Sequence, residues 1–231
     1  MPENADSRVL INKDMRNFYK GKYYLTTTNT FRNIEYFENP ILSRCLIDEI
    51  KESKDYYGFD LFAFIINLEH FHMLIRSNDE SISNIMKSIK KNSSQNINRI
   101  LSHNQLSVPE NPHSRDNKDS HSQDNKDSHS RDNKDSIDIS LINQYEKQMN
   151  RWNRLSRLKN DFINKHSLME YPKFKWHKSF HDRYARNKSD LMNKLNYIHR
   201  NPSKHGIAES WQNYPWSSLN SEFTNMIDKL P

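Results

Sequence analysis

Apolar residues form two kinds of pattern along the chain, and the first kind, short segments rich in apolar, aromatic and β-branched residues, predicts strands. Residues 22–29 are rich in aromatic and β-branched side chains, and 59–66 and 70–75 are nearly unbroken apolar runs. This composition suits a pleated, half-buried surface. A short polar segment, 67–69, separates the two runs. We therefore expect one early strand and, later, two paired antiparallel strands.

A spacing of three to four residues predicts three helices. Asn39 and Pro40 can cap and begin a helix in which apolar residues recur every fourth position to about Tyr57. Residues 81–101 place isoleucine and methionine on one helical face, and 141–163 repeat the pattern with aromatic and basic residues. The last stripe fits either a packing face or a nucleic-acid contact, and packing is the more frequent role.

The region after Pro172 predicts the last strand and helix. Residues 173–178 alternate as a half-buried strand does, and 187–200 have helical spacing. Asn201 and Pro202 should end this helix, because the residue before a proline avoids the α region. The order β-α-β-β-α, insert and helix, then β-α predicts an α+β, ferredoxin-like antiparallel sheet with helices on one face.

An octapeptide repeats three times between His113 and Ser136, and it contains no apolar residue. Its composition predicts a disordered insert. Its regularly spaced histidines could chelate a metal, but duplication of one short unit explains their spacing equally simply. The expected division is a polar arm at 1–18, one domain at 19–219 interrupted by the insert 103–138 and a long extra helix 139–166, and a tail at 220–231.

Composition narrows the possible functions. The chain has 35 basic and 29 acidic residues. Without the repeat it has 30 basic and 23 acidic residues, so the positive net charge lies in the rest of the chain. This net charge favours a nucleic-acid partner. Only three glycines occur, none in a phosphate-cradling loop, which excludes P-loop and Rossmann enzymes. The single Cys45 cannot form an intrachain disulfide, and no apolar run reaches about 18 residues. We expect a cytoplasmic protein without a membrane partner.

Two short motifs carry candidate chemistry. His70 and His72 project to the same side of a strand, where two imidazoles can bind one divalent cation or can simply be buried polar groups. Tyr197 and Asn201 lie one turn apart on a helix, which permits a shared site. Alternatively, the tyrosine belongs to the core and Asn201 only ends the helix.

The combination of motifs is more specific than either alone. The stretches are Ile66-Asn-Leu-Glu-His-Phe-His-Met-Leu-Ile-Arg76, Phe180-His-Asp-Arg-Tyr-Ala-Arg-Asn187 and Tyr197-Ile-His-Arg-Asn-Pro-Ser-Lys-His-Gly206, with a trailing Trp211 and Pro215-Trp-Ser-Ser218. Together they resemble the HUH single-tyrosine transposases, and most closely the REP-associated tyrosine transposase branch. The likeness covers about 22–101 and 173–219. Leu68 and Ser203 stand where that pattern often has proline and valine, and neither position supplies a reacting group.

The resemblance implies a DNA transposase that cleaves and rejoins single-stranded DNA, at hairpin-containing sites, through a 5′-phosphotyrosine. It implies that Tyr197 is the nucleophile, that His70 and His72 bind Mg²⁺ or Mn²⁺, and that Asn201 completes the metal site. Imidazole ligands alone would favour Zn²⁺ or Mn²⁺, so the expectation of Mg²⁺ comes from the resemblance. The expected assembly is a monomer or a homodimer.

Basic residues near these motifs are candidate phosphate contacts, although each also fits a solvated surface. They are Lys87, Lys90, Lys91, Arg183, Arg186, Arg200 and Lys204. Two other functions stay open: a domesticated single-strand DNA-binding protein that no longer transposes, and a metal-dependent nuclease in which water attacks and Tyr197 is structural.

Overall fold

The structure is a computed structural model that describes residues 19–104, 107–110, 139–166 and 171–230. The octapeptide repeat, with its expected disorder, lies outside these residues. Within them, no helix has both the length and the apolar character that crossing a bilayer demands.

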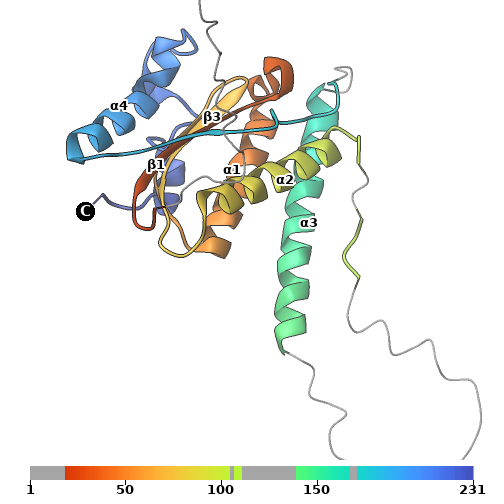
Figure 1. The fold of residues 1–231 in the computed structure, drawn as a ribbon. Coiled ribbons are helices and arrows are strands. Elements are labelled where there is room, and N and C mark those ends of the chain that lie inside the picture. Colours follow the sequence, from red (N-terminus) through yellow and green to blue (C-terminus); the bar gives the residue numbers. More distant parts are fainter. Residues whose placement is uncertain (1–18, 105–106, 111–138, 167–170, 231) are drawn as a thin grey trace, which may run out of the picture.

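Four strands form one antiparallel sheet, which confirms the predicted α+β class (Figure 1). They are β1 (Tyr23–Asn29), β2 (Asp60–Ile66), β3 (His70–Arg76) and β4 (His181–Tyr184), in the spatial order β2-β3-β1-β4. With the helix α1 (Pro40–Tyr57) between β1 and β2 and α2 (Ile82–Ile100) before β4, this is the ferredoxin-like order.

Side chains of β3 alternate between two separate cores. Phe71, Met73 and Ile75 are fully buried in the larger core, beneath α1 and α2. Leu74 belongs to a smaller core on the other face, and His70 and His72 project to that same face because strand side chains alternate. Both faces of β3 are therefore covered.

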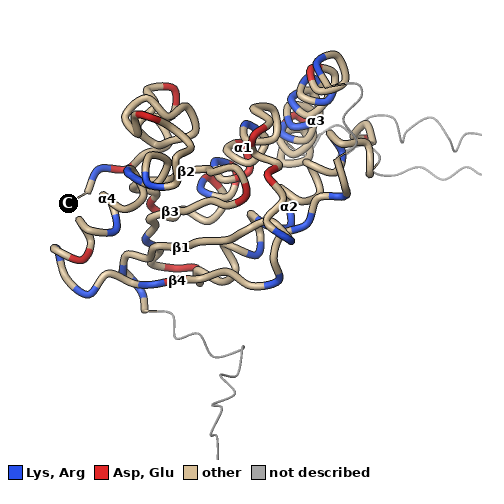
Figure 2. The backbone as a smooth tube through the Cα atoms, turned by 90° about the horizontal axis from the view of Figure 1, so that it is seen from above, with Lys and Arg blue, Asp and Glu red and all other residues tan. Residues whose placement is uncertain are grey.

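The expectation that helices cover one face is wrong for the last helix. α4 (Lys188–Lys204) packs against the second face, where Ile198 joins the smaller core with Leu74. Figure 2 shows α4 on the opposite side of the sheet from α1 and α2. This placement brings α4 over the face that carries the two histidines.

The fourth strand is not where the alternating pattern predicts it. Phe174 and Trp176 do point inward, but they pack among aromatic core residues, and the only strand-like pairing of 173–178 in the described residues is one bridge from Trp176 to Thr30. The paired strand is β4, whose side chains are mostly exposed. An exposed edge strand has no apolar alternation for a sequence pattern to detect.

α4 also continues beyond its expected end. Pro202 lies inside the helix, which runs to Lys204. A proline removes one backbone donor from the helix, and the burial of Asn201 and Pro202 offsets this loss. The extra turn carries Lys204 and His205 toward the histidine-bearing face.

The long helix α3 (Ile139–His166) packs against the larger core through few residues, chiefly Leu155 and Phe162. Ion pairs also join it to α1. Arg151 Nη2 lies 2.9 Å from Glu49 Oε2, and the Glu49 side chain is 1% exposed. Burial raises the pKa of Glu49, and Arg151 opposes that effect.

Replacing Arg151 should destabilise the protein, because Glu49 would keep a buried charge without its cation. We expect Arg151→Ala to lower the free energy of unfolding by about 2 kcal/mol, less than for a fully buried pair because Arg151 is partly exposed. Urea unfolding followed by circular dichroism measures the loss. Lys51→Ala, which breaks an exposed pair with Asp55, should cost less than about 1 kcal/mol. Equal losses in the two variants would contradict a special role for the Arg151 pair.

Candidate active site

The two histidines predicted to share a site lie next to each other. The rings of His70 and His72 have centroids 4.9 Å apart, and the residues are 7% and 4% exposed. Burial lowers the pKa of both, and the pKa of His72 falls to about 3. Both imidazoles are therefore neutral at neutral pH, which is the form that binds a metal ion.

Neighbouring side chains orient each imidazole. Glu69 Oε1 lies 2.8 Å from His70 Nδ1. Because a carboxylate only accepts, Nδ1 carries the proton and His70 Nε2 is left as an acceptor. Thr27 Oγ1 lies 2.6 Å from His72 Nδ1, and His72 Nε2 is buried with no hydrogen-bond partner.

Asn67 connects the histidine pair to α4. Its Nδ2 donates to His70 Nε2 at 2.8 Å and to Asn201 Oδ1 at 2.6 Å. Two acceptor atoms from different elements therefore converge on one position. Asn67 Oδ1 is also buried without a partner, and both asparagines are fully buried.

Imidazole nitrogens and an amide oxygen are donor types that a small divalent cation accepts. Asn67 Nδ2 now holds His70 Nε2 and Asn201 Oδ1 together, and the unpaired Nε2 of His72 belongs to the adjoining ring. The described residues contain no group of three or more histidine, cysteine or acidic residues suited to a metal. The candidate ligand set consists of two imidazoles and an amide oxygen, with Asn67 close by.

Tyr197 lies beside the histidines of its own chain. Its ring centroid is 5.3 Å from that of His72, and the residue is 37% exposed. Lys204 Nζ lies 5.4 Å from the centroid of the Tyr197 ring, a cation–π arrangement. His205, the residue after Lys204, has its ring centroid 5.8 Å from that of His70.

A cleft opens at Tyr197. It has a volume of 430 Å³, and its lining includes Thr27, His72, His181, Arg183, Lys194 and Tyr197. Lys194 Nζ lies 2.8 Å from Asp190 Oδ1, and this contact is the main reason that the pKa of Asp190 is strongly lowered. The cleft thus brings the Tyr197 side chain together with imidazoles, cations and the carboxylate of Asp190.

The predicted phosphate contacts do not form a single surface. Arg183 lines the cleft and Lys204 lies over Tyr197, whereas Lys90 and Lys91 line a different pocket near α2. The other three are exposed: Lys87 on α2, Arg186 just before α4 and Arg200 on α4. Figure 2 shows basic residues along α2, α3 and β4 as well.

Sequence reasoning missed four residues of this site. Thr27, Glu69 and Asn67 bind the imidazole nitrogens, and His205 adds a third imidazole. Glu69 and Asn67 stand next to the histidine motif, so a search for polar neighbours would have found them. Thr27 is found only through the register of β1 and β3, which pairs it with His72.

The fold and the site define a class: an antiparallel α+β domain in which a His-x-His strand faces a helical tyrosine. Residues 17–113, which contain the histidine pair, match the family model described as transposase IS200 like. This match confirms the resemblance to transposases that the sequence predicted.

Solved structures similar to the chain include two that are described as transposases. One is described as a REP-associated tyrosine transposase bound to a REP hairpin; it has 15% identity and a TM-score of 0.47, with 93% of this chain and 87% of that chain covered. The other is a putative transposase from Deinococcus radiodurans, with 16% identity and a TM-score of 0.33, covering 59% and 97%. No curated protein matches the chain.

Proposed function

We propose that this protein is a DNA transposase that cleaves and rejoins single-stranded DNA with Tyr197 as nucleophile. The observation that carries the proposal is the approach of Tyr197 on α4 to His72 on β3, with 5.3 Å between the ring centroids, in a cleft that Arg183 also lines. The family match supports a transposase.

In the cleavage step, Tyr197 Oη forms a bond to phosphorus while the bond from phosphorus to the 3′ oxygen breaks. The phenolic proton passes to solvent, and the departing oxygen takes up a proton to become a 3′-hydroxyl. The 5′ phosphate stays on the tyrosine. In the reverse step a 3′-hydroxyl attacks the phosphotyrosine, so rejoining requires no ATP.

His70, His72 and Asn201 would hold a divalent cation, Mg²⁺ or Mn²⁺. Such a cation supplies positive charge that polarises the scissile phosphate. Glu69 and Thr27 fix the imidazole orientations, Lys204 restrains the Tyr197 ring, and Arg183 offers a cation to the bound strand. The neutral, buried imidazoles and the unpaired His72 Nε2 support this assignment.

The DNA partner is proposed to be single-stranded and to include a hairpin. The similar structure bound to a REP hairpin suggests the probe, and the basic cleft suits a phosphate backbone. Tyr197 and the histidines of one chain already adjoin, so a monomer has every proposed reacting group.

One assay separates this function from its two rivals. Purified protein is incubated with Mn²⁺ and labelled single strands from its own genomic flanks, and products are resolved on denaturing gels. We expect a covalent protein–DNA adduct and a free 3′-hydroxyl fragment. Cleavage without an adduct would indicate a nuclease that uses water, and binding without cleavage would indicate a DNA-binding module.

The carboxylate of Glu69 provides a test of the cation site. Glu69→Gln keeps the size of the side chain but weakens its hold on His70 Nδ1, so we expect Mn²⁺ affinity to fall about 10- to 100-fold. Isothermal titration measures the affinity without DNA. Glu35→Gln, an exposed change outside the cleft, is the control, and equal affinities in both variants would count against the cation site.

A further inference from the structure

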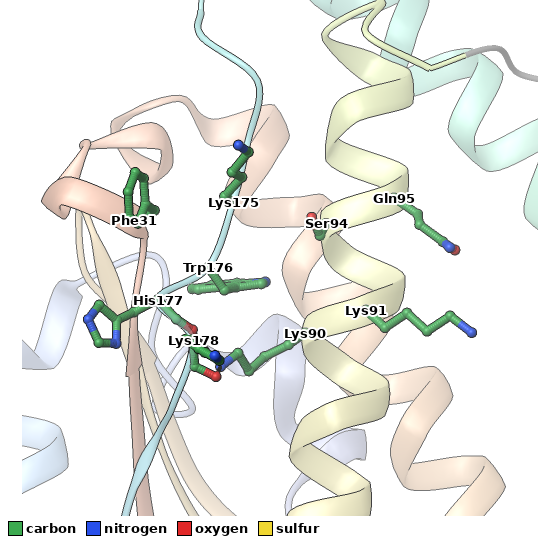
Figure 3. Close-up of a pocket in the computed structure, with 9 residues that line it drawn as sticks. All are labelled: Phe31, Lys90, Lys91, Ser94, Gln95, Lys175, Trp176, His177 and Lys178. Carbon is green, nitrogen blue, oxygen red and sulfur yellow. Dashed lines mark hydrogen bonds between the residues drawn. The ribbon is translucent and has the colours of Figure 1, made fainter.

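A second pocket lies away from the cleft, between α2, Phe31 and the chain that leads to β4 (Figure 3). We call it the lysine groove. It has a volume of 640 Å³, and no acidic residue lines it. The lining residues that matter here are Phe31, Lys90, Lys91, Lys175, Trp176 and Lys178.

The groove has a firmly held floor and rim. Trp176 Nε1 donates to Ser93 Oγ at 2.9 Å, and its ring packs against Phe71 and Phe174. Lys90 Nζ donates to the carbonyl oxygens of His177 and Ser179, at 2.8 and 3.0 Å. Lys90 therefore fixes the rim, which is a structural role different from the phosphate contact predicted for it.

The remaining cations face solvent. Lys91, Lys175 and Lys178 are exposed, and within the described part of the chain none of them has a carboxylate partner. Figure 3 shows Lys91 on α2, directed away from Trp176, and Lys175 on the chain that leads to β4. Three such cations without acidic neighbours suit a run of phosphates.

Phe31 adds an aromatic surface to these charges. It is 43% exposed at one end of the groove, just before Arg32 and Asn33, which have φ angles of 62° and 52°. Positive φ is unusual for arginine and costs of order 1 kcal/mol. Arg32 Cζ lies 5.3 Å from the centroid of the Phe31 ring, and a nucleic-acid base can stack on the exposed part of the ring.

One short segment of chain joins the groove, on the α2 side of the sheet, to the catalytic cleft, on the α4 side. Lys178 lines the groove, and three residues later His181 lines the cleft that contains Tyr197. An extended chain rises roughly 3.3 Å per residue, and the chain bends at Lys178, so these positions are at most about 10 Å apart. Stacked nucleotides advance about 3.4 Å each along a strand, so only a few nucleotides span that distance.

We propose that the lysine groove binds single-stranded DNA flanking the cleaved phosphate. Lys91, Lys175 and Lys178 contact backbone phosphates, and Phe31 stacks on an unpaired base. The assignment of this strand as the flank of a cleavage site rests on the proposed function, whereas the binding itself does not.

Fluorescence anisotropy with a labelled oligothymidylate, in EDTA so that no cleavage occurs, tests the groove. We expect Phe31→Ala to weaken binding roughly 5- to 100-fold, as removal of one base-stacking aromatic does. Tyr56→Ala is the matched control, because Tyr56 is 75% exposed and lies on α1 outside both sites. Equal binding by these two variants would overturn the stacking role.

The salt dependence of binding tests the lysines. Lys175→Ala with Lys178→Ala should reduce the slope of log affinity against log salt by about 1.4, since each phosphate contact on a single strand contributes about 0.7. Lys51→Ala with Lys229→Ala changes the net charge equally, at exposed positions elsewhere, and should leave most of the slope intact. Equal slopes in the two double variants would overturn the phosphate contacts.

Two further comparisons separate the possible failures. If the groove variants weaken a duplex of the same length more than the single strand, the groove binds a stem and the proposal is wrong. If wild-type protein binds through the groove but forms no adduct with Mn²⁺, the proposed catalytic function fails and the groove stands. Thermal unfolding by circular dichroism verifies that every variant is folded.

Discussion

Tyr197→Phe should abolish the covalent adduct and reduce strand cleavage by at least about 10³-fold, the usual scale for loss of a catalytic nucleophile. The change removes one oxygen from a side chain that is 37% exposed. The free energy of unfolding should therefore change by less than about 0.5 kcal/mol. Adduct formation is measured on denaturing gels, and stability by urea unfolding.

Tyr184→Phe is a suitable control for this result, because Tyr184 lies on β4 and is 44% exposed. It should keep the adduct. An adduct that persists in Tyr197→Phe and disappears in Tyr184→Phe would show that Tyr184, and not Tyr197, is the nucleophile. Cleavage that continues without any adduct in Tyr197→Phe would instead identify water as the nucleophile.

The contact between Tyr197 and His72 within one chain also bears on assembly. If the active site is built by one chain, a mixture of Tyr197→Phe protein and His72→Ala protein should remain inactive, because no single chain then has both groups. Restored cleavage in the mixture would show instead that the tyrosine of one protomer joins the histidines of its partner.

Local pattern was enough to predict most of the sheet and its covering helices. In β3, apolar residues at both even and odd positions indicate a strand buried on both faces, and His70 and His72 share one face because of the period of two. For α1, Asn39 as cap and Pro40 in the first turn are visible directly in the sequence. Such features depend on neighbouring residues alone.

The errors fall where tertiary contacts override local preference. β4 is exposed and polar, so it has little apolar signal, whereas Phe174 and Trp176 alternate because they pack into the core. Pro202 predicts the end of a helix, but its burial with Asn201 keeps α4 helical to Lys204. The expected helix would have ended before Lys204 and His205, both of which reach the site.

In the candidate site, too, local spacing was predicted correctly and tertiary contacts were not. The spacing of Tyr197 and Asn201 predicts a common face of α4, and the geometry agrees. The spacing does not predict against which face of the sheet these two residues pack. The bond from Asn67 to Asn201 joins residues 134 positions apart. Only the packing of α4 on the second face brings these groups together.

His72→Ala should have the largest effect on cation binding, because it removes the one buried imidazole nitrogen of the pair that has no other partner. Loss of an outer-shell partner costs about 10- to 100-fold in metal affinity, so loss of a direct ligand should cost more than about 100-fold. Isothermal titration with Mn²⁺ measures the affinity, and the adduct assay should show a parallel loss. His199→Ala is the control: its ring stacks on Trp211, away from the histidine pair, and burial lowers its pKa also. A folded His72→Ala protein that binds Mn²⁺ as the His199→Ala protein does would remove His72 from the cation site, and with it the reason for placing a metal beside Tyr197.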